Sequence, residues 1–115
     1  MNLNVKIQDI EKKVNIPIEE DEYQGKKSTY MVFSYDDERP ILNADNEPYA
    51  DMADITFQLI MPKNADYMNL KHQIRDELEN SGFSVTAIRT LLGSAMNGTD
   101  KIRRIIFETN YTEER

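Results

Sequence analysis

Acidic side chains gather in one segment of the 115-residue chain, and carboxylates are its best-represented chemical group. Paired carboxylates bind divalent cations or act as a general acid and base. The residues around Asp45 lack the alternating acids and following glycine of a calcium-binding loop. A carboxylate-based metal enzyme is therefore only a third hypothesis, and it would draw on Asp36, Asp37, Glu38, Asp45, Glu47, Asp51 and Asp54.

Other catalytic groups are scarce. His72 is the single histidine, and it lies about 200° around a predicted helix from Leu70 and Ile74, which predicts exposure to solvent. The chain has no cysteine, which excludes disulfide scaffolds, thiol catalysis and most structural zinc sites. Its four glycines are scattered, so no phosphate-cradling loop is present. We expect no enzyme, no cofactor and no bound metal.

Two helices are predicted from apolar stripes at helical spacing. The first covers about residues 2–14 and ends before Ile16-Pro17, because the residue before proline avoids the helical region. The second covers about 65–80, with Asn64 as its N-cap and Gly82 in the left-handed conformation that ends many helices. The two stripes are Leu3, Ile7, Ile10 and Val14, and Tyr67, Leu70, Ile74 and Leu78.

Four strands are predicted at about 28–35, 52–61, 83–92 and 101–111. They are rich in β-branched and aromatic residues, and residues 52–61 alternate between apolar and polar side chains. Residues 19–22 have no periodicity and are predicted to form an exposed connector. Between the first two strands, Pro40, Pro48 and a turn-forming stretch at 43–46 break the pattern, and we predict an extended hairpin arm at about 36–52.

The predicted order of elements is α-β-β-α-β-β. It corresponds to one α+β domain over residues 1–115, an α/β sandwich whose mainly antiparallel four-stranded sheet is covered by helices. Asn97-Gly98, between the last two strands, favours a hairpin.

The net charge of −7 is unevenly distributed. Residues 19–54 carry eleven acids against three basic residues, whereas residues 55–115 are balanced. A chain with a pI near 4.7 is a poor binder of nucleic-acid phosphates. The acidic segment either consists of solvated loops or forms a surface that repels anions or docks on a basic partner. The sequence has no apolar run long enough to span a membrane and no apolar signal-peptide core, so we expect a small, soluble, intracellular domain.

Several segments carry a resemblance to a known family. They are Met31-Val32-Phe33-Ser34-Tyr35, Asp37-Glu38-Arg39-Pro40, Ala44-Asp45-Asn46-Glu47, Gln58-Leu59-Ile60, Tyr67-Met68-Asn69-Leu70, Ile74, Leu78 and Ser81-Gly82-Phe83. Together they resemble the tail terminator family of long-tailed bacteriophages and prophages of Gram-positive bacteria, also called tail completion, minor capsid or head–tail joining proteins. The resemblance covers about half of the chain and involves no catalytic signature.

The resemblance implies a structural virion protein. Six copies would form a hexameric ring on the head-proximal end of the tail tube, end polymerisation of the major tail tube protein, and offer a docking surface to the head connector or stopper protein. DNA would pass through the lumen without specific binding. Assembly would take place in the host bacterial cytoplasm, with the finished ring at the head–tail interface of the virion and no membrane involved.

In such a ring the 36–52 segment would contact the adjacent subunit or the tail tube. The candidate interface residues are Arg39, Ile41, Leu42, Asp45, Asn46 and Tyr49, and the candidate acidic lumen residues are Asp36, Asp37 and Glu38. Alternatively, the segment is an acidic loop that folds back on its own sheet. A rival function is a small acidic nucleic-acid mimic or regulatory binding protein, although its acids are predicted to lie in connectors rather than on one rigid face.

Overall fold

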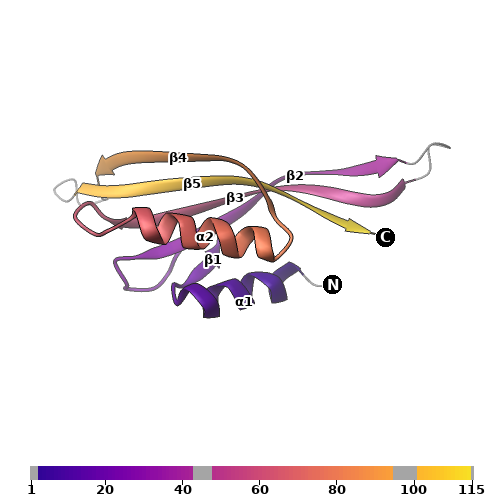
Figure 1. Ribbon diagram of the computed structural model, residues 1–115. Helices are drawn as coiled ribbons and strands as arrows, with labels where there is room; N and C mark the ends of the chain where they lie inside the picture. Colours follow the sequence, from indigo (N-terminus) through magenta and orange to yellow (C-terminus); the bar gives the residue numbers. More distant parts are fainter. Residues whose placement is uncertain (1–2, 43–47, 95–100, 115) are drawn as a thin grey trace.

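The computed structural model describes residues 3–42, 48–94 and 101–114 (Figure 1). These residues form two helices and a single five-stranded sheet with the strand order β1-β2-β3-β5-β4. β1 pairs with β2 in parallel, and every other pairing is antiparallel. The elements are α1 (Leu3–Val14), β1 (Ile18–Glu20), β2 (Tyr30–Leu42), β3 (Pro48–Pro62), α2 (Met68–Asn80), β4 (Ser84–Ser94) and β5 (Lys101–Glu114).

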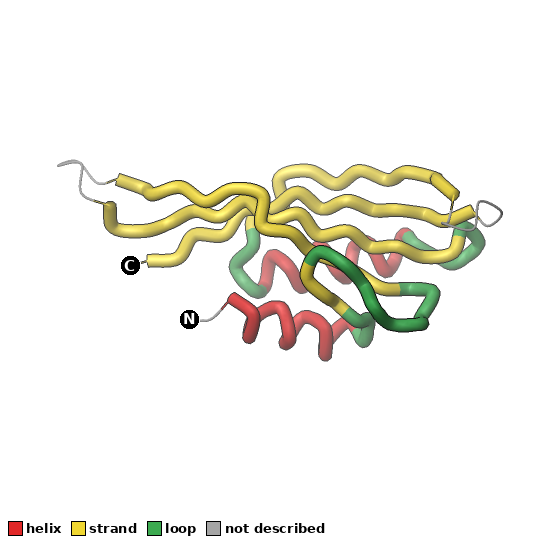
Figure 2. Tube along the Cα trace, turned by 180° about the vertical axis from the view of Figure 1, so that it is seen from behind, coloured by secondary structure: helices red, strands yellow, loops and turns green. Residues whose placement is uncertain are grey.

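Both helices lie side by side against one face of the sheet, as the two opposite views agree (Figures 1 and 2). The predicted stripe of α1 is confirmed, since Ile7, Ile10 and Val14 are buried. Two contacts join the helices at their polar sides. Lys13 forms an ion pair with Glu77 at 3.8 Å, and Lys6 donates a hydrogen bond to the carbonyl oxygen of Ser81 at 2.9 Å. The helical layer is therefore held by apolar burial and tied at its rim.

An aromatic cluster links the sheet to the end of α2. The ring of Phe57 lies 5.9 Å from that of Phe33 on β2 and 5.3 Å from that of Phe83, and Phe83 lies 5.1 Å from Tyr111 on β5. Phe57, Phe83 and Phe107 are at most 1% exposed. The inward residues of β3 continue this core, and they are Ile55, Phe57, Leu59 and Met61. The alternation predicted for residues 52–61 is confirmed.

The C-terminal end of α2 follows the prediction, whereas its N-terminal end does not. Gly82 has a positive φ of 97°, and the amide of Phe83 donates to the carbonyl of Leu78 at 3.0 Å. The helix begins at Met68 rather than at 65, and Asn64 is not its N-cap. Residues 62–65 instead form a turn, in which the amide of Ala65 donates to the carbonyl of Pro62.

The predicted fold class is wrong in its sheet. The sheet is five-stranded and mixed rather than four-stranded and antiparallel, and the order of elements is α-β-β-β-α-β-β. The difference arises because Ile18 and the first two residues of the expected connector make the edge strand β1. Three residues are too few to produce a periodic signal. The strand is specified by distant partners: Met31 donates its amide to the carbonyl of Pro17, and Asp21 donates to the carbonyl of Phe33, each at 2.8 Å.

The strands are also longer than predicted. β2 continues to Leu42 rather than ending at 35, and β3 begins at Pro48 rather than at 52. β5 continues to Glu114 rather than ending at 111. The polar residues of these extensions hide the strand signal, but backbone pairing does not require apolar side chains. Pro40 is tolerated because β1 pairs with β2 only as far as Phe33, which leaves the rest of β2 as an edge.

We predict that Ile74→Ala lowers the free energy of unfolding by about 2–5 kcal/mol, because the side chain is fully buried against the sheet. Urea unfolding measures the change. His72→Ala is the matched control, since His72 lies exposed on the same helix and its loss should have little effect. A loss below about 1 kcal/mol for Ile74→Ala would contradict the packing described for α2.

Candidate functional site

A polar three-stranded ribbon extends beyond the helical layer. We call it the acidic ribbon: Asp36–Leu42 of β2, Pro48–Asp54 of β3 and Asn110–Glu114 of β5. Figure 1 shows these strand ends continuing past both helices, and the molecule is 56 Å long but only 25 Å wide. Its described residues carry one cation, Arg39, and seven carboxylates, namely Asp36, Asp37, Glu38, Asp51, Asp54, Glu113 and Glu114.

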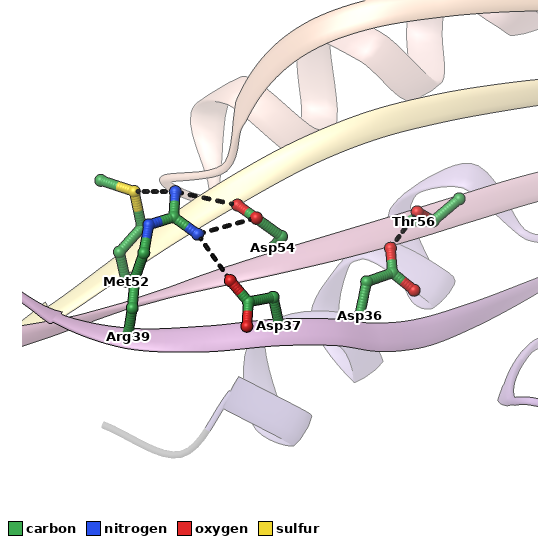
Figure 3. A network of polar contacts seen from close by, with 6 residues as sticks. All are labelled: Asp36, Asp37, Arg39, Met52, Asp54 and Thr56. Atoms are coloured by element: carbon green, nitrogen blue, oxygen red, sulfur yellow. Dashed lines mark hydrogen bonds and ion pairs between the residues drawn. The ribbon is translucent and has the colours of Figure 1, made fainter.

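Arg39 is the centre of a polar network on one face of the ribbon (Figure 3). Its Nη1 donates to Asp54 Oδ2 at 2.8 Å and to Asp37 Oδ2 at 3.1 Å. Its Nη2 contacts Asp54 Oδ1 at 3.4 Å and the sulfur of Met52 at 3.2 Å. The hydrogen bond to Asp54 and the two carboxylate charges raise the pKa of Arg39 above its ordinary value. The guanidinium thus holds β2 to β3 where the ribbon has no core.

Asp36 lies at an irregularity of the β2–β3 ladder, between the pairs of Tyr35 and Asp37. Its carboxylate accepts a hydrogen bond from the hydroxyl of Thr56 (Figure 3) and another from the hydroxyl of Ser34. An extra residue in one strand shifts the side chains that follow it relative to the partner strand. Consecutive residues of a regular strand face opposite sides, so the irregularity brings two of the three predicted lumen residues to one face. Asp36 and Asp37 lie with Asp54 and Thr56 on one face, and Glu38 contributes to a hollow on the other.

That second face has a hollow of about 340 Å³ at the base of the ribbon, beside the start of α1. Its rim is acidic, with Glu38, Asp51 and Glu113, and its apolar part is formed by Leu3, Tyr35, Ala53 and Tyr111. Tyr35 is 44% exposed. Partial burial, followed by the charges of Glu20, Glu113 and Glu38, raises the pKa of the Tyr35 phenol above 10.0. This environment disfavours an additional negative charge and favours a cationic group.

A hollow of about 290 Å³ lies on the opposite face. It is lined by Asp36, Asp54, Thr56, Thr86, Glu108, Thr109 and Asn110. The base of the ribbon therefore presents carboxylates on both of its faces. Within residues 3–42, 48–94 and 101–114, no group of three or more histidine, aspartate or glutamate side chains is arranged to hold a metal ion. The carboxylates on both faces are suited to binding cationic side chains.

The predicted interface residues have different positions. Arg39 is engaged within its own ribbon, Ile41 pairs with Ala50 and is half-buried, and Leu42 is 50% exposed. Tyr49 belongs to β3, but its side chain lies outside the described part of the chain, as do Asp45 and Asn46. The structure thus brings Arg39 together with Asp37, and it does not bring Glu38 to the same face.

Sequence reasoning missed several contributors to this site. The sequence analysis names Asp54 only as a possible metal ligand. Its place on the polar side of an alternating strand nevertheless indicates that it faces polar side chains of the neighbouring strand. Met52 and Glu113 carried no such signal. Glu113 reaches the ribbon only because β5 pairs with β3 as far as the Ala50–Glu114 pair.

Comparisons with known proteins add no assignment. The sequence matches no protein-family model and no curated protein. Among the described residues, no helix has the length and apolar character needed to cross a membrane.

We predict that Arg39→Gln loosens the ribbon locally, because Asp37 and Asp54 would face each other without a cation. Hydrogen exchange of the amides in 37–41 and 50–54 should become faster, while global unfolding changes little, since the network is exposed. Arg75→Gln is the matched control, since Arg75 pairs with Asp76 and Glu79 on α2. Unchanged exchange in the ribbon of Arg39→Gln would contradict the role assigned to this guanidinium.

We predict that alkaline titration reveals a tyrosine that ionises above its ordinary pKa, and that Tyr35→Phe removes it. Because folding raises the pKa of Tyr35, the free energy of unfolding should fall as the pH increases from about 10 through the folded-state pKa. Tyrosinate absorbance and urea unfolding on either side of this range measure both effects. Glu38→Gln should lower the pKa of Tyr35, and an unchanged value would contradict the assigned electrostatic contact.

Proposed function

We propose that the chain is a tail terminator-type structural protein of a long-tailed bacteriophage or prophage. Copies of the chain associate in a ring on the head-proximal end of the tail tube, stop its polymerisation and provide a docking surface for the head connector. The observation that carries the proposal is the acidic ribbon, a paired extension that leaves the core and is suited to contacts outside its own domain. The resemblance of residues 31–83 to the tail terminator family is the reason for proposing a phage tail as the assembly.

A ring requires one surface of each subunit to meet a different surface of the next. The ribbon supplies one such surface, because it extends beyond the helices and carries a net negative charge. Leu42, half exposed near the ribbon end, offers apolar contact area to a neighbour or to the tube.

The acidic character of the ribbon also suits a channel for DNA. Carboxylates repel phosphates within a screening length of about 8 Å at physiological salt, so DNA would not adhere to a wall that carries them. Asp36 and Asp37 share one ribbon face, and that face is the candidate lumen surface. Glu38 lies apart from them and is better placed for contact with a basic group of a partner.

One observation favours the rival function, a small acidic protein that mimics nucleic acid. The carboxylates of 36–38 and 51–54 lie on paired strands rather than in connectors, which gives them the fixed spacing that a mimic requires. Arg39 neutralises part of this surface, which weakens the mimicry. Salt-sensitive binding of this chain to a basic DNA-binding protein of the host, together with normal phage tails after deletion of the gene for this chain, would establish the rival function.

The deciding experiment is electron microscopy of lysates from the parent phage or prophage after deletion of this gene. Full heads without tails, beside free tails that are overlong or irregular at one end, would support the terminator role. Normal tails attached to heads would refute it. Normal-length tails that remain unattached would refute length termination and leave only the joining role.

We further predict that Arg39→Glu in the phage leaves a folded protein but abolishes its assembly onto tails, because the substitution replaces the cation that holds the ribbon strands together. Circular dichroism checks the fold, and phage yield checks assembly. Arg75→Glu makes the same charge change on α2, outside the ribbon, and should leave the yield near normal. A normal yield from Arg39→Glu would contradict the importance of the ribbon.

A further inference from the structure

The end of the molecule opposite the ribbon is basic. Figure 1 shows the end of β4, the start of β5 and the start of α2 lying together at this end. Four cations flank the C-terminal half of β4. On the helix side, Arg103 and Lys71 lie over the ring of Tyr67 at 4.1 and 5.7 Å, and Lys71 Nζ reaches the hydroxyl of Thr90 at 3.5 Å. On the other side are Arg89, which forms an exposed ion pair with Glu108 at 3.5 Å, and Arg104, which donates to the side-chain oxygen of Gln58.

β4 is an edge strand without the usual protection against pairing. Its outer side has no partner strand in the described part of the chain. Edge strands are commonly blunted by proline, by charges or by short length. β4 is 11 residues long, has no proline and carries one charged residue, Arg89, and its second half presents Leu91 and Leu92 at 49% and 52% exposure. The irregularity of its ladder lies near its start, between Val85 and Ala87.

The free edge of β2 is built differently. Beyond Phe33 it contains Pro40, an irregularity at Asp36, and a run of charged residues. The two edges of the sheet are thus unlike each other, since one has a proline and a run of acids and the other has two exposed leucines and a single arginine. The two edges also differ in charge, since carboxylates lie along the ribbon and cations lie beside β4.

We propose that the outer edge of β4, from Ile88 to Gly93 with its flanking cations, is the docking surface for the acidic ribbon of a second copy of this chain. The proposal deepens the proposed function and rests on it for the identity of the partner. In this contact Leu91 and Leu92 are covered, and the ribbon carboxylates meet Lys71, Arg89, Arg103 and Arg104.

Geometry makes the contact intermolecular and directional. The two surfaces lie toward opposite ends of a molecule 56 Å long, so one copy cannot join its own ribbon to its own β4 edge. Each copy uses its ribbon on one neighbour and its β4 edge on the other. Such a heterologous contact closes into a ring if the rotation between copies closes, and continues as a filament if it does not.

A charge-exchange experiment tests the contact. Variant A carries Glu38→Lys and Glu114→Lys on the ribbon, and variant B carries Lys71→Glu and Arg89→Glu beside β4. Each variant alone has lost most of the charge complementarity between its two docking surfaces and should associate roughly tenfold or more weakly than the original chain in sedimentation velocity at low salt. An equimolar mixture should associate again, because each variant then offers the surface that the other lost.

Matched controls carry the same charge changes elsewhere. Asp76→Lys with Glu79→Lys corresponds to variant A, and Lys12→Glu with Arg75→Glu corresponds to variant B; all four positions lie on the helices. Both controls should associate like the original chain, and circular dichroism verifies folding of all variants. Association of A or B alone at the original strength, a mixture that stays monomeric, or an original chain that is monomeric at every salt concentration would each overturn the proposal.

Hydrogen exchange then tests the edge itself. Amides of residues 88–93 that point outward from β4 should become protected in the original assembly and in the A plus B mixture, but not in either variant alone. Association without this protection would overturn strand-edge docking. The proposed interface and the proposed phage role can be refuted separately. If the mixture of A and B associates but deletion of the gene leaves normal tails, the phage role is refuted and the interface is retained. If deletion gives defective tails but the mixture does not associate, the interface is refuted and the phage role is retained.

Discussion

The strands β2, β3 and β5 extend well beyond the helices that cover them, and the division of the molecule into a core and an acidic ribbon follows from that difference in length. The 15 residues of β3 span about 50 Å at the usual rise per residue, whereas the 13 residues of α2 span about 20 Å. The main hydrophobic cluster forms where the helices lie over the sheet. The remainder of β2, β3 and β5 has to remain paired without a core, and it does so through its backbone ladder and the Arg39 network.

The covered half and the uncovered half are stabilised by different forces. Under the helices, Phe33, Phe57 and Phe83 form contiguous aromatic contacts, and burial of this area supplies the driving force for folding. In the ribbon, exposed ion pairs contribute little to global stability and instead select one arrangement of the strands. A region of this kind can adjust to a partner while the rest of the domain stays folded.

Charge follows the same division along the molecule. The ribbon holds seven carboxylates and one guanidinium among its described residues, and the opposite end holds the cations beside β4. Separated charges on a long molecule orient neighbouring copies before they touch and suppress contacts between like ends. This property suits a structural protein that assembles head to tail, which connects the proposed β4 docking surface with the proposed ring.

Both helices can be predicted from the sequence to within a few residues, as can the left-handed turn at Gly82 and the inward face of β3, because these depend on local periodicity and backbone preference. The strand at residues 18–20, the mixed sheet and the length of the ribbon cannot, because each depends on pairing with residues distant in sequence. The tertiary structure also decided the composition of the site. Asp54 meets Arg39 through strand register, and Asp36 shares a face with Asp37 through the irregularity of the ladder, and no local pattern encodes either contact.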